Sequence, residues 1–263
     1  MRIALGLEYD GAAFCGWQTQ PSGCGVQDHL QSALSRFADS PIEVTAAGRT
    51  DTGVHAAAQV VHFDSPVRRE AFSWVRGTNT FLPQSARVMW ACEVPGDFHA
   101  RYDACSRTYR YLLLDSPVAP AILHGRVGWF HRPLDVAAME EGARALAGTH
   151  DFSAFRDAQC QAKSPVRDLL AVRVERAGAL VAFTFRANAF LHHMVRNIVG
   201  ALVYVGAGRE APGWIGELLA ARDRTRSAPT FMPDGLYLAA VEYDPALGLP
   251  AFPPHPLLDL VSR

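Results

Sequence analysis

The chain has 263 residues, of which 49% are hydrophobic and 19% are charged, and its formal net charge is -1 at pH 7. This composition excludes a disordered or fibrous protein and predicts a globular chain with a sizeable core. Because the charge is nearly balanced, any contact with nucleic acid has to come from a local basic surface.

The hydrophobic periodicity predicts two α+β halves. In the first half, strands are expected at residues 2–9, 42–47, 59–63 and 86–94, and helices at residues 27–37 and 69–76. In the second half, strands are expected at residues 108–114, 169–174, 180–186 and 235–243, and helices at residues 134–146, 192–205 and 213–221. The predicted division is residues 1–104 and 105–263, with a cleft between the halves as the natural site.

The cysteines and the apolar runs indicate in which compartment of the cell the protein is expected. Five scattered cysteines without a C-x-x-C pair predict neither a disulfide framework nor a structural zinc site. The apolar N-terminal stretch meets Glu8 and Asp10 too early for a signal peptide, and the longest later run, near residues 198–207, falls short of the roughly 20 residues that span a bilayer. We therefore expect a cytoplasmic protein without a membrane segment.

The segment of residues 48–56 (GRTDTGVHA) is the first candidate for chemistry. Glycines on both sides permit a tight turn that can present the Asp51 carboxylate, and Arg49 lies two residues before it. A shielded carboxylate beside a guanidinium suits a nucleophile. The residues alone leave open the simpler interpretation, in which Asp51 only caps a turn.

Two later segments combine aromatic and basic residues. On the strand around Tyr109, alternation places Arg107, Tyr109 and Tyr111 on one face, where an aromatic ring between cations can stack on an extruded base. A strand with a half-exposed aromatic face explains the same pattern. Arg196 begins a largely apolar helix and needs an anionic partner, which a structural or a catalytic ion pair would supply equally well.

Taken together and in order, these segments resemble the tRNA pseudouridine synthase A family over nearly the whole chain. The matching segments are residues 9–11, 14, 16–20, 26–27, 48–56, 59–63, 79, 82–83, 98–101, 107–111, 151–155, 190–200 and 235–238. The resemblance implies an α+β fold of two ferredoxin-like, RRM-like halves, whose sheets join into one mostly antiparallel sheet with a central active-site cleft. It also implies a homodimer that grips tRNA.

The resemblance further implies roles for five residues. Asp51 is the essential catalytic carboxylate, Arg49 helps to extrude the target base, and Tyr109 stacks near that base and can act as a base itself. Arg196 pairs with Asp51, and Leu236 forms a wall of the substrate pocket. The implied reaction isomerises uridines to pseudouridine on the 3′ side of the tRNA anticodon stem-loop (tRNA positions 38, 39 and 40), with no cofactor and no metal.

Two rival functions use the same residues differently. Ferredoxin-like halves with aromatic residues on strands also describe a non-catalytic RNA-binding protein, for which Asp51 would be dispensable. A metal-dependent hydrolase would use His55, His62 and Asp51. The adjacent His192 and His193 are not four residues apart, so they do not share a metal from one helical face.

Overall fold

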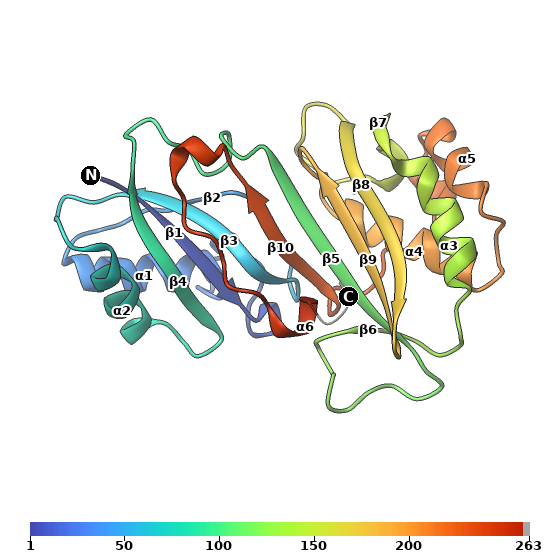
Figure 1. The fold of residues 1–263 in the computed structure, drawn as a ribbon, viewed down its shortest axis with the longest axis horizontal. Coiled ribbons are helices and arrows are strands. Elements are labelled where there is room, and N and C mark those ends of the chain that lie inside the picture. The colour runs from blue at the N-terminus through green and yellow to red at the C-terminus, as the bar shows by residue number, and fades with distance from the viewer. Residues whose placement is uncertain (260–263) are drawn as a thin grey trace. The chain divides into compact units, whose positions relative to one another are not determined.

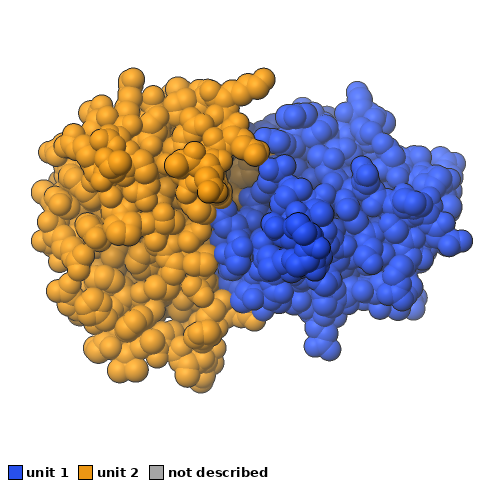
Figure 2. Space-filling model, turned by 180° about the vertical axis from the view of Figure 1, so that it is seen from behind, with its two compact units in different colours: residues 1–105, 237–255 blue, residues 106–236, 256–263 orange. Residues whose placement is uncertain are grey.

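The computed structural model describes residues 1–259, which form two compact units (Figures 1 and 2). Unit 1 contains residues 1–105 and 237–255, and unit 2 contains residues 106–236 and 256–259. The sequence-based division places residues 237–255 in the second half, whereas in the structure they belong to unit 1. Figure 2 colours these residues with the N-terminal part.

Unit 1 is built on a mostly antiparallel sheet. Its strands are β1 (Arg2–Tyr9), β2 (Thr45–Ala46), β3 (His55–Asp64), β4 (Ala86–Val94) and β10 (Leu236–Glu242), and its α-helices are α1 (Val26–Ala38) and α2 (Ala71–Phe81). The first residue of β10, Leu236, still belongs to unit 2. The strand order is β4-β1-β3-β10, with β2 beside β3. β1 runs antiparallel to both β3 and β4, whereas β10 runs parallel to β3.

The two faces of the unit 1 sheet are covered by different parts of the chain. On one face, Trp74 of α2 packs edge-on between Phe37 of α1 and Phe63 of β3. On the other face, Trp90 of β4 packs against Phe252 of the C-terminal segment, which Figure 1 draws in red across the strands. The central strand β3 is therefore buried on both sides along nearly its whole length.

Unit 2 is also built on mostly antiparallel strands. Its strands are β5 (Ser106–Asp115), β6 (Gly128–Phe130), β7 (Gly148–Asp151), β8 (Val166–Ala177) and β9 (Leu180–Ala187), and its α-helices are α3 (Val136–Ala143), α4 (Met194–Gly206), α5 (Trp214–Ala221) and α6 (Pro256–Asp259). The order β5-β9-β8-β7 is antiparallel throughout, and β6 runs parallel to β5. α4 is apolar nearly all round and is the central helix, since 11 of its 13 residues are buried.

The α+β class with one large, mostly antiparallel sheet agrees with the prediction, and most elements lie where the periodicity places them. The bounds of β1 and β4 are those expected. The predicted strand over residues 42–47 is reduced to β2, and β3 begins four residues earlier than predicted. α2 continues to Phe81, where a loop was expected. β6 and β7 were not predicted.

One prediction about the cysteines is wrong. Cys15 and Cys24 form a disulfide, with 5.4 Å between their Cα atoms, whereas Cys92, Cys105 and Cys160 are unpaired. The pairing was missed because nothing in the spacing indicates it. It arises because the chain folds back between residues 15 and 24, where the Cys15 backbone N–H donates to the Cys24 carbonyl at 3.0 Å.

Within residues 1–259, no helix combines the length and the apolar character needed to cross a membrane.

Candidate active site

The loop that carries Asp51 is held by its backbone on both sides. The Trp17 N–H donates to the Thr50 carbonyl at 3.0 Å, and the Gln59 side-chain amide donates to the Gly48 carbonyl at 2.7 Å. Gln59 is fully buried in β3. The residues before Asp51 are therefore tied both to the sheet and to the segment that precedes α1.

A tight turn follows Asp51. The Val54 N–H donates to the Asp51 carbonyl at 3.1 Å, and Gly53 adopts a φ of 81°, which residues with a side chain rarely reach. Gly11 packs so closely on the Val54 carbonyl that a Cβ atom at Gly11 would collide with it. Sequence and structure agree that glycines shape this turn.

The side chain next to Asp51 anchors the loop in the core. Thr50 is 6% exposed, and its hydroxyl shares a hydrogen bond of 2.8 Å with the Tyr9 hydroxyl. Burial raises the pKa of Tyr9 to about 12, and hydrogen bonds from Thr50 and Gln59 only partly oppose this shift. Tyr9 is thus a neutral structural support at physiological pH and not a proton acceptor.

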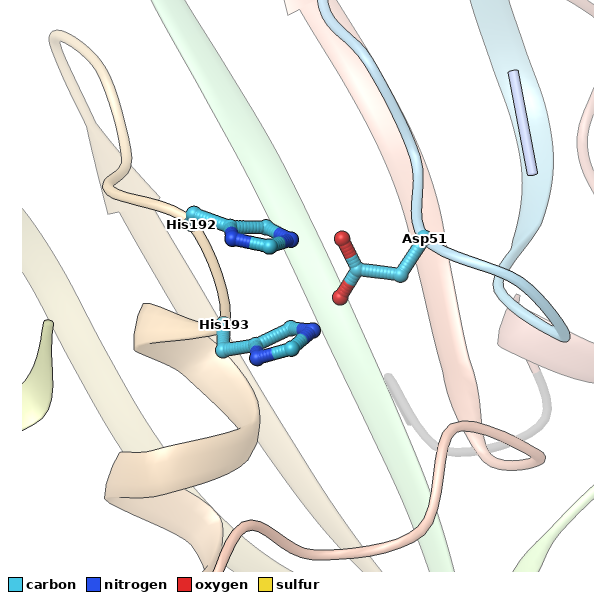
Figure 3. A group of neighbouring side chains, drawn as sticks. All are labelled: Asp51, His192 and His193. Atoms are coloured by element: carbon cyan, nitrogen blue, oxygen red, sulfur yellow. The ribbon is translucent and has the colours of Figure 1, made fainter. Parts of the chain in front are cut away.

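Asp51 itself is half-buried and Arg49 is exposed. Figure 3 shows Asp51 extending from the loop that precedes β3. Because residues 48, 50 and 54 are pinned, the carboxylate of Asp51 is presented by a stiff backbone. This geometry suits a group that has to meet a substrate, and it goes beyond what a turn cap requires.

The two histidines of β3 serve different local structures. The His55 ring stacks on Tyr237 with centroids 4.6 Å apart, and its Nδ1 accepts from the Gly11 N–H at 3.1 Å. His62 accepts from the Ala100 N–H at 3.1 Å. Seven residues along one strand separate the rings by roughly 23 Å, so they cannot bind one ion. The metal-dependent hydrolase hypothesis is wrong in this respect.

Three of the five predicted site residues belong to unit 2, and Tyr109 lies on its strand β5. Tyr109 is 9% exposed and meets Phe190 edge-on, with ring centroids 5.0 Å apart. Its neighbours are also held, because Arg107 donates to the Asn188 carbonyl at 3.0 Å and Tyr111 donates to the Met232 carbonyl at 2.9 Å. The face around Tyr109 is packed and not the half-exposed surface of the simpler interpretation.

Arg196 and Leu236 are also held firmly. The Arg196 Nε donates to the Phe231 carbonyl at 2.8 Å, which fixes the direction of the guanidinium in the first turn of α4. Leu236 is 4% exposed, and its N–H donates to the Pro233 carbonyl at 2.8 Å.

An unpredicted pair of histidines precedes α4. His193 adopts a left-handed backbone with a φ of 60°, and its Nδ1 lies 2.7 Å from an oxygen of Asp157. Burial favours a higher pKa for Asp157, but the Gln159 backbone N–H and His193 outweigh it, so the pKa lies below its ordinary value. The His192 and His193 rings stack with their centroids 3.9 Å apart, and Figure 3 draws the two rings one above the other. Non-glycine residues in this conformation occur preferentially at functional sites.

The sequence reasoning gave no role to the residues that support the candidate site. Tyr9, Trp17 and Gln59 hold the Asp51 loop, and each lies in a segment that carries the family resemblance. Their place in these matching segments was the signal by which the sequence could have identified them. His193 also lies in such a segment, but Asp157 does not, and their pairing joins positions 36 residues apart in the chain.

Comparisons with known proteins identify the family of this chain. A family model described as tRNA pseudouridine synthase matches residues 7–103 and 143–244. The tRNA pseudouridine synthase A of Methylobacillus flagellatus is 59% identical over 250 residues, covering 95% of this chain and 96% of that protein. The proteins of the same name from Herminiimonas arsenicoxydans and Paraburkholderia phymatum are 58% and 57% identical, each over 95% of this chain and over 92% and 94% of their own lengths. The chain therefore belongs to the tRNA pseudouridine synthase family, whose members isomerise uridine to pseudouridine.

Proposed function

We propose that this protein isomerises uridines on the 3′ side of the tRNA anticodon stem-loop, at tRNA positions 38, 39 and 40, with Asp51 as the essential carboxylate. The observation that carries the proposal is the loop of residues 48–54. Its backbone is fixed by Trp17, Gln59 and Tyr9, while the carboxylate of Asp51 stays partly exposed.

The chemistry requires few groups. Conversion to pseudouridine breaks the bond from N1 to C1′, turns the base and joins C5 to C1′, without net oxidation. One well-positioned carboxylate in a shaped pocket is sufficient, so the proposed reaction uses no cofactor and no metal. The target base has to leave its stack, which costs a few kcal/mol. Arg49 is exposed on the same loop as Asp51, where it can occupy the space of the extruded base.

The residues of unit 2 complete the proposed site. Tyr109 would stack near the target base, and its edge contact with Phe190 keeps its ring from turning. Arg196 would pair with Asp51, and its bond to the Phe231 carbonyl limits where its guanidinium can reach. Leu236 would form an apolar wall of the pocket, in a cleft between the two halves of the chain.

The proposed partner is tRNA, bound by a homodimer in the cytoplasm. The relatives that are 57–59% identical are named for action on tRNA. All but one of the 25 basic residues are arginines, with Lys163 the exception, and guanidinium groups suit phosphate contacts.

The decisive experiment compares the parent with Asp51→Ala and Asp51→Asn. Uridine-containing tRNA is incubated with each protein, and pseudouridine is measured by mass spectrometry after chemical labelling. We expect both substitutions to reduce the rate by at least about 10³-fold, because the group is proposed to act on the reacting atoms. Asp97→Ala, which removes an exposed carboxylate elsewhere in unit 1, serves as the matched control and should keep the parental rate.

Parental turnover by Asp51→Ala would contradict the catalytic assignment. A parent protein that binds tRNA but forms no pseudouridine would favour the non-catalytic RNA-binding alternative. Mapping the product by sequencing tests the proposed positions separately, since pseudouridine outside the anticodon arm would contradict them and leave the isomerase activity intact.

A further inference from the structure

The disulfide between Cys15 and Cys24 closes a ring of chain directly before α1. Within the ring and beside it, the backbone forms a short ladder: Cys15 donates to Cys24 at 3.0 Å, and the Gly16 and Trp17 carbonyls accept from the first two residues of α1 at 3.0 Å each. The tip of the ring, residues 18–23, is exposed. Cys15 is also exposed and Cys24 is half-buried, so a small reductant or oxidant can reach the pair.

This ring supports the backbone on both sides of Asp51. Trp17 donates to the Thr50 carbonyl at 3.0 Å. Gly16 lies so close that a Cβ atom there would be 2.9 Å from the Thr50 oxygen and 3.1 Å from the Thr52 nitrogen. The Trp17 ring is buried against Tyr9, with centroids 6.0 Å apart, and Tyr9 holds the Thr50 hydroxyl. A movement of residues 15–17 is therefore transmitted to residues 50–52.

Without the disulfide, the ring would keep part of its structure. Gln20 and Gly25 both donate their backbone N–H groups to the Asp28 carboxylate, at 3.2 and 2.9 Å, and the ladder to α1 remains. The exposed tip has few other contacts, so breaking the crosslink increases its conformational freedom without unfolding unit 1. Breaking the disulfide therefore makes the position of the Asp51 loop less precise but leaves the fold of unit 1 intact.

We propose that the Cys15–Cys24 disulfide is a reversible positioning crosslink for the Asp51 loop, through which the rate of isomerisation depends on the thiol oxidation state. This inference rests on the proposed catalytic role of Asp51. In the oxidising direction, the two thiols give up two protons and two electrons to a peroxide, which forms two molecules of water as the sulfur–sulfur bond forms. In the reducing direction, a dithiol reverses the change and is itself oxidised to a disulfide.

The test measures single-turnover formation of pseudouridine in tRNA by the full chain after treatment with hydrogen peroxide or with dithiothreitol. Labelling of free thiols and mass spectrometry report the state of the pair in each sample. We expect the oxidised protein to react about tenfold faster than the reduced one, since small misplacements of a reacting group cost up to about 100-fold. The Kd for tRNA should change less than about twofold, because the crosslink orients the carboxylate and not the docking surface.

Three variants distinguish this role from a general structural one. Cys24→Ser and the double variant Cys15→Ser with Cys24→Ser should react at the slow rate of the reduced parent under both treatments. Cys105→Ser, which removes an unpaired and exposed thiol, should keep the full response.

Several outcomes would overturn the proposal: equal rates for the oxidised and reduced parent, a redox response that survives in Cys24→Ser, or two free thiols at positions 15 and 24 after peroxide treatment. Failure of the proposed function looks different. In that case no sample forms pseudouridine, or Asp51→Ala reacts at the rate of the parent.

Discussion

Thr50 uses its carbonyl and its hydroxyl for partners that lie 33 and 41 positions earlier in the chain. The sequence alone indicated a turn around Asp51 and left open whether the aspartate was more than a cap. Local residues cannot decide this, because a glycine-bounded turn is compatible with both. The buried contacts of Thr50 with Trp17 and Tyr9 favour the interpretation in which the turn is built to present a group.

His62 gives a residue-scale prediction for the dependence of stability on pH. Burial, together with the charges of Arg2 and His99, lowers its pKa to about 4, against opposing effects of Asp64 and Asp103. In the unfolded chain the pKa of histidine is about 6.5, so unfolding takes up a proton between these values. The free energy of unfolding should be fully retained above pH 6.5 and should fall by about 3 kcal/mol as the pH drops to 4.

The measurement compares urea unfolding of the parent and of His62→Asn at pH 7 and at pH 4.5. Asparagine can offer an oxygen near the position of Nδ1 to the Ala100 N–H, but it does not titrate. The variant should therefore lose less stability between the two pH values than the parent does. The same loss in both proteins would show that His62 does not contribute.

At the scale of single elements, prediction succeeded where the signal is local and failed where packing overrides it. β1 and β4 have the expected bounds because apolar runs end at turn residues. α2 continues through Gly77 although glycine disfavours helices, since Phe37 occupies the space that a side chain at Gly77 would need. β3 begins at His55 because parallel pairing with β10 extends it, and β10 comes from the other end of the chain.

Gly6 in the middle of β1 provides the prediction at this scale. It pairs with Val60 and Trp90 on the flanking strands, and a Cβ atom would collide with the rings of Trp90 and Phe252. Gly6→Ala should lower the free energy of unfolding by about 1–3 kcal/mol, because the packed rings have to move. Gly96→Ala is the matched control, since nothing lies within 4 Å of its Cβ position. Equal free energies of unfolding for the two variants would mean that the Trp90 and Phe252 rings move aside without loss of stability.

At the scale of the whole molecule, the chain crosses between units more than once. Residues 237–255 follow unit 2 in sequence but complete the core of unit 1, where Phe252 packs on Trp90 at 5.4 Å between ring centroids. The chain after β10 is therefore part of a core. The contribution of this segment to the core depends on strands formed by the first 94 residues. The sequence of the segment by itself therefore does not reveal it.

This assignment predicts where a substitution in the segment after β10 acts. Phe252→Ala should destabilise unit 1 by about 2 kcal/mol, which corresponds to roughly 30-fold faster amide hydrogen exchange in β1 and β4. Exchange in β8 and β9 should change little. Met139→Ala, in the buried interface of α3 and α4, is the matched substitution in unit 2 and should give the opposite distribution. Faster exchange throughout the chain in both variants would show that the two units unfold together.

The sequence by itself determined the class of the fold, most of the helices and strands, and the segments that identify the family. These properties follow from periodicity, turn residues and short motifs, which are encoded within a few neighbouring positions. Only the tertiary structure decided that Tyr9, Trp17 and Gln59 hold the Asp51 loop, that Cys15 and Cys24 are joined, that His193 is paired with Asp157, and that residues 237–255 belong to unit 1. Each of these contacts joins groups that are distant in the chain or that meet only when the chain folds back. Neither the composition nor the spacing of residues indicates that such groups lie close together.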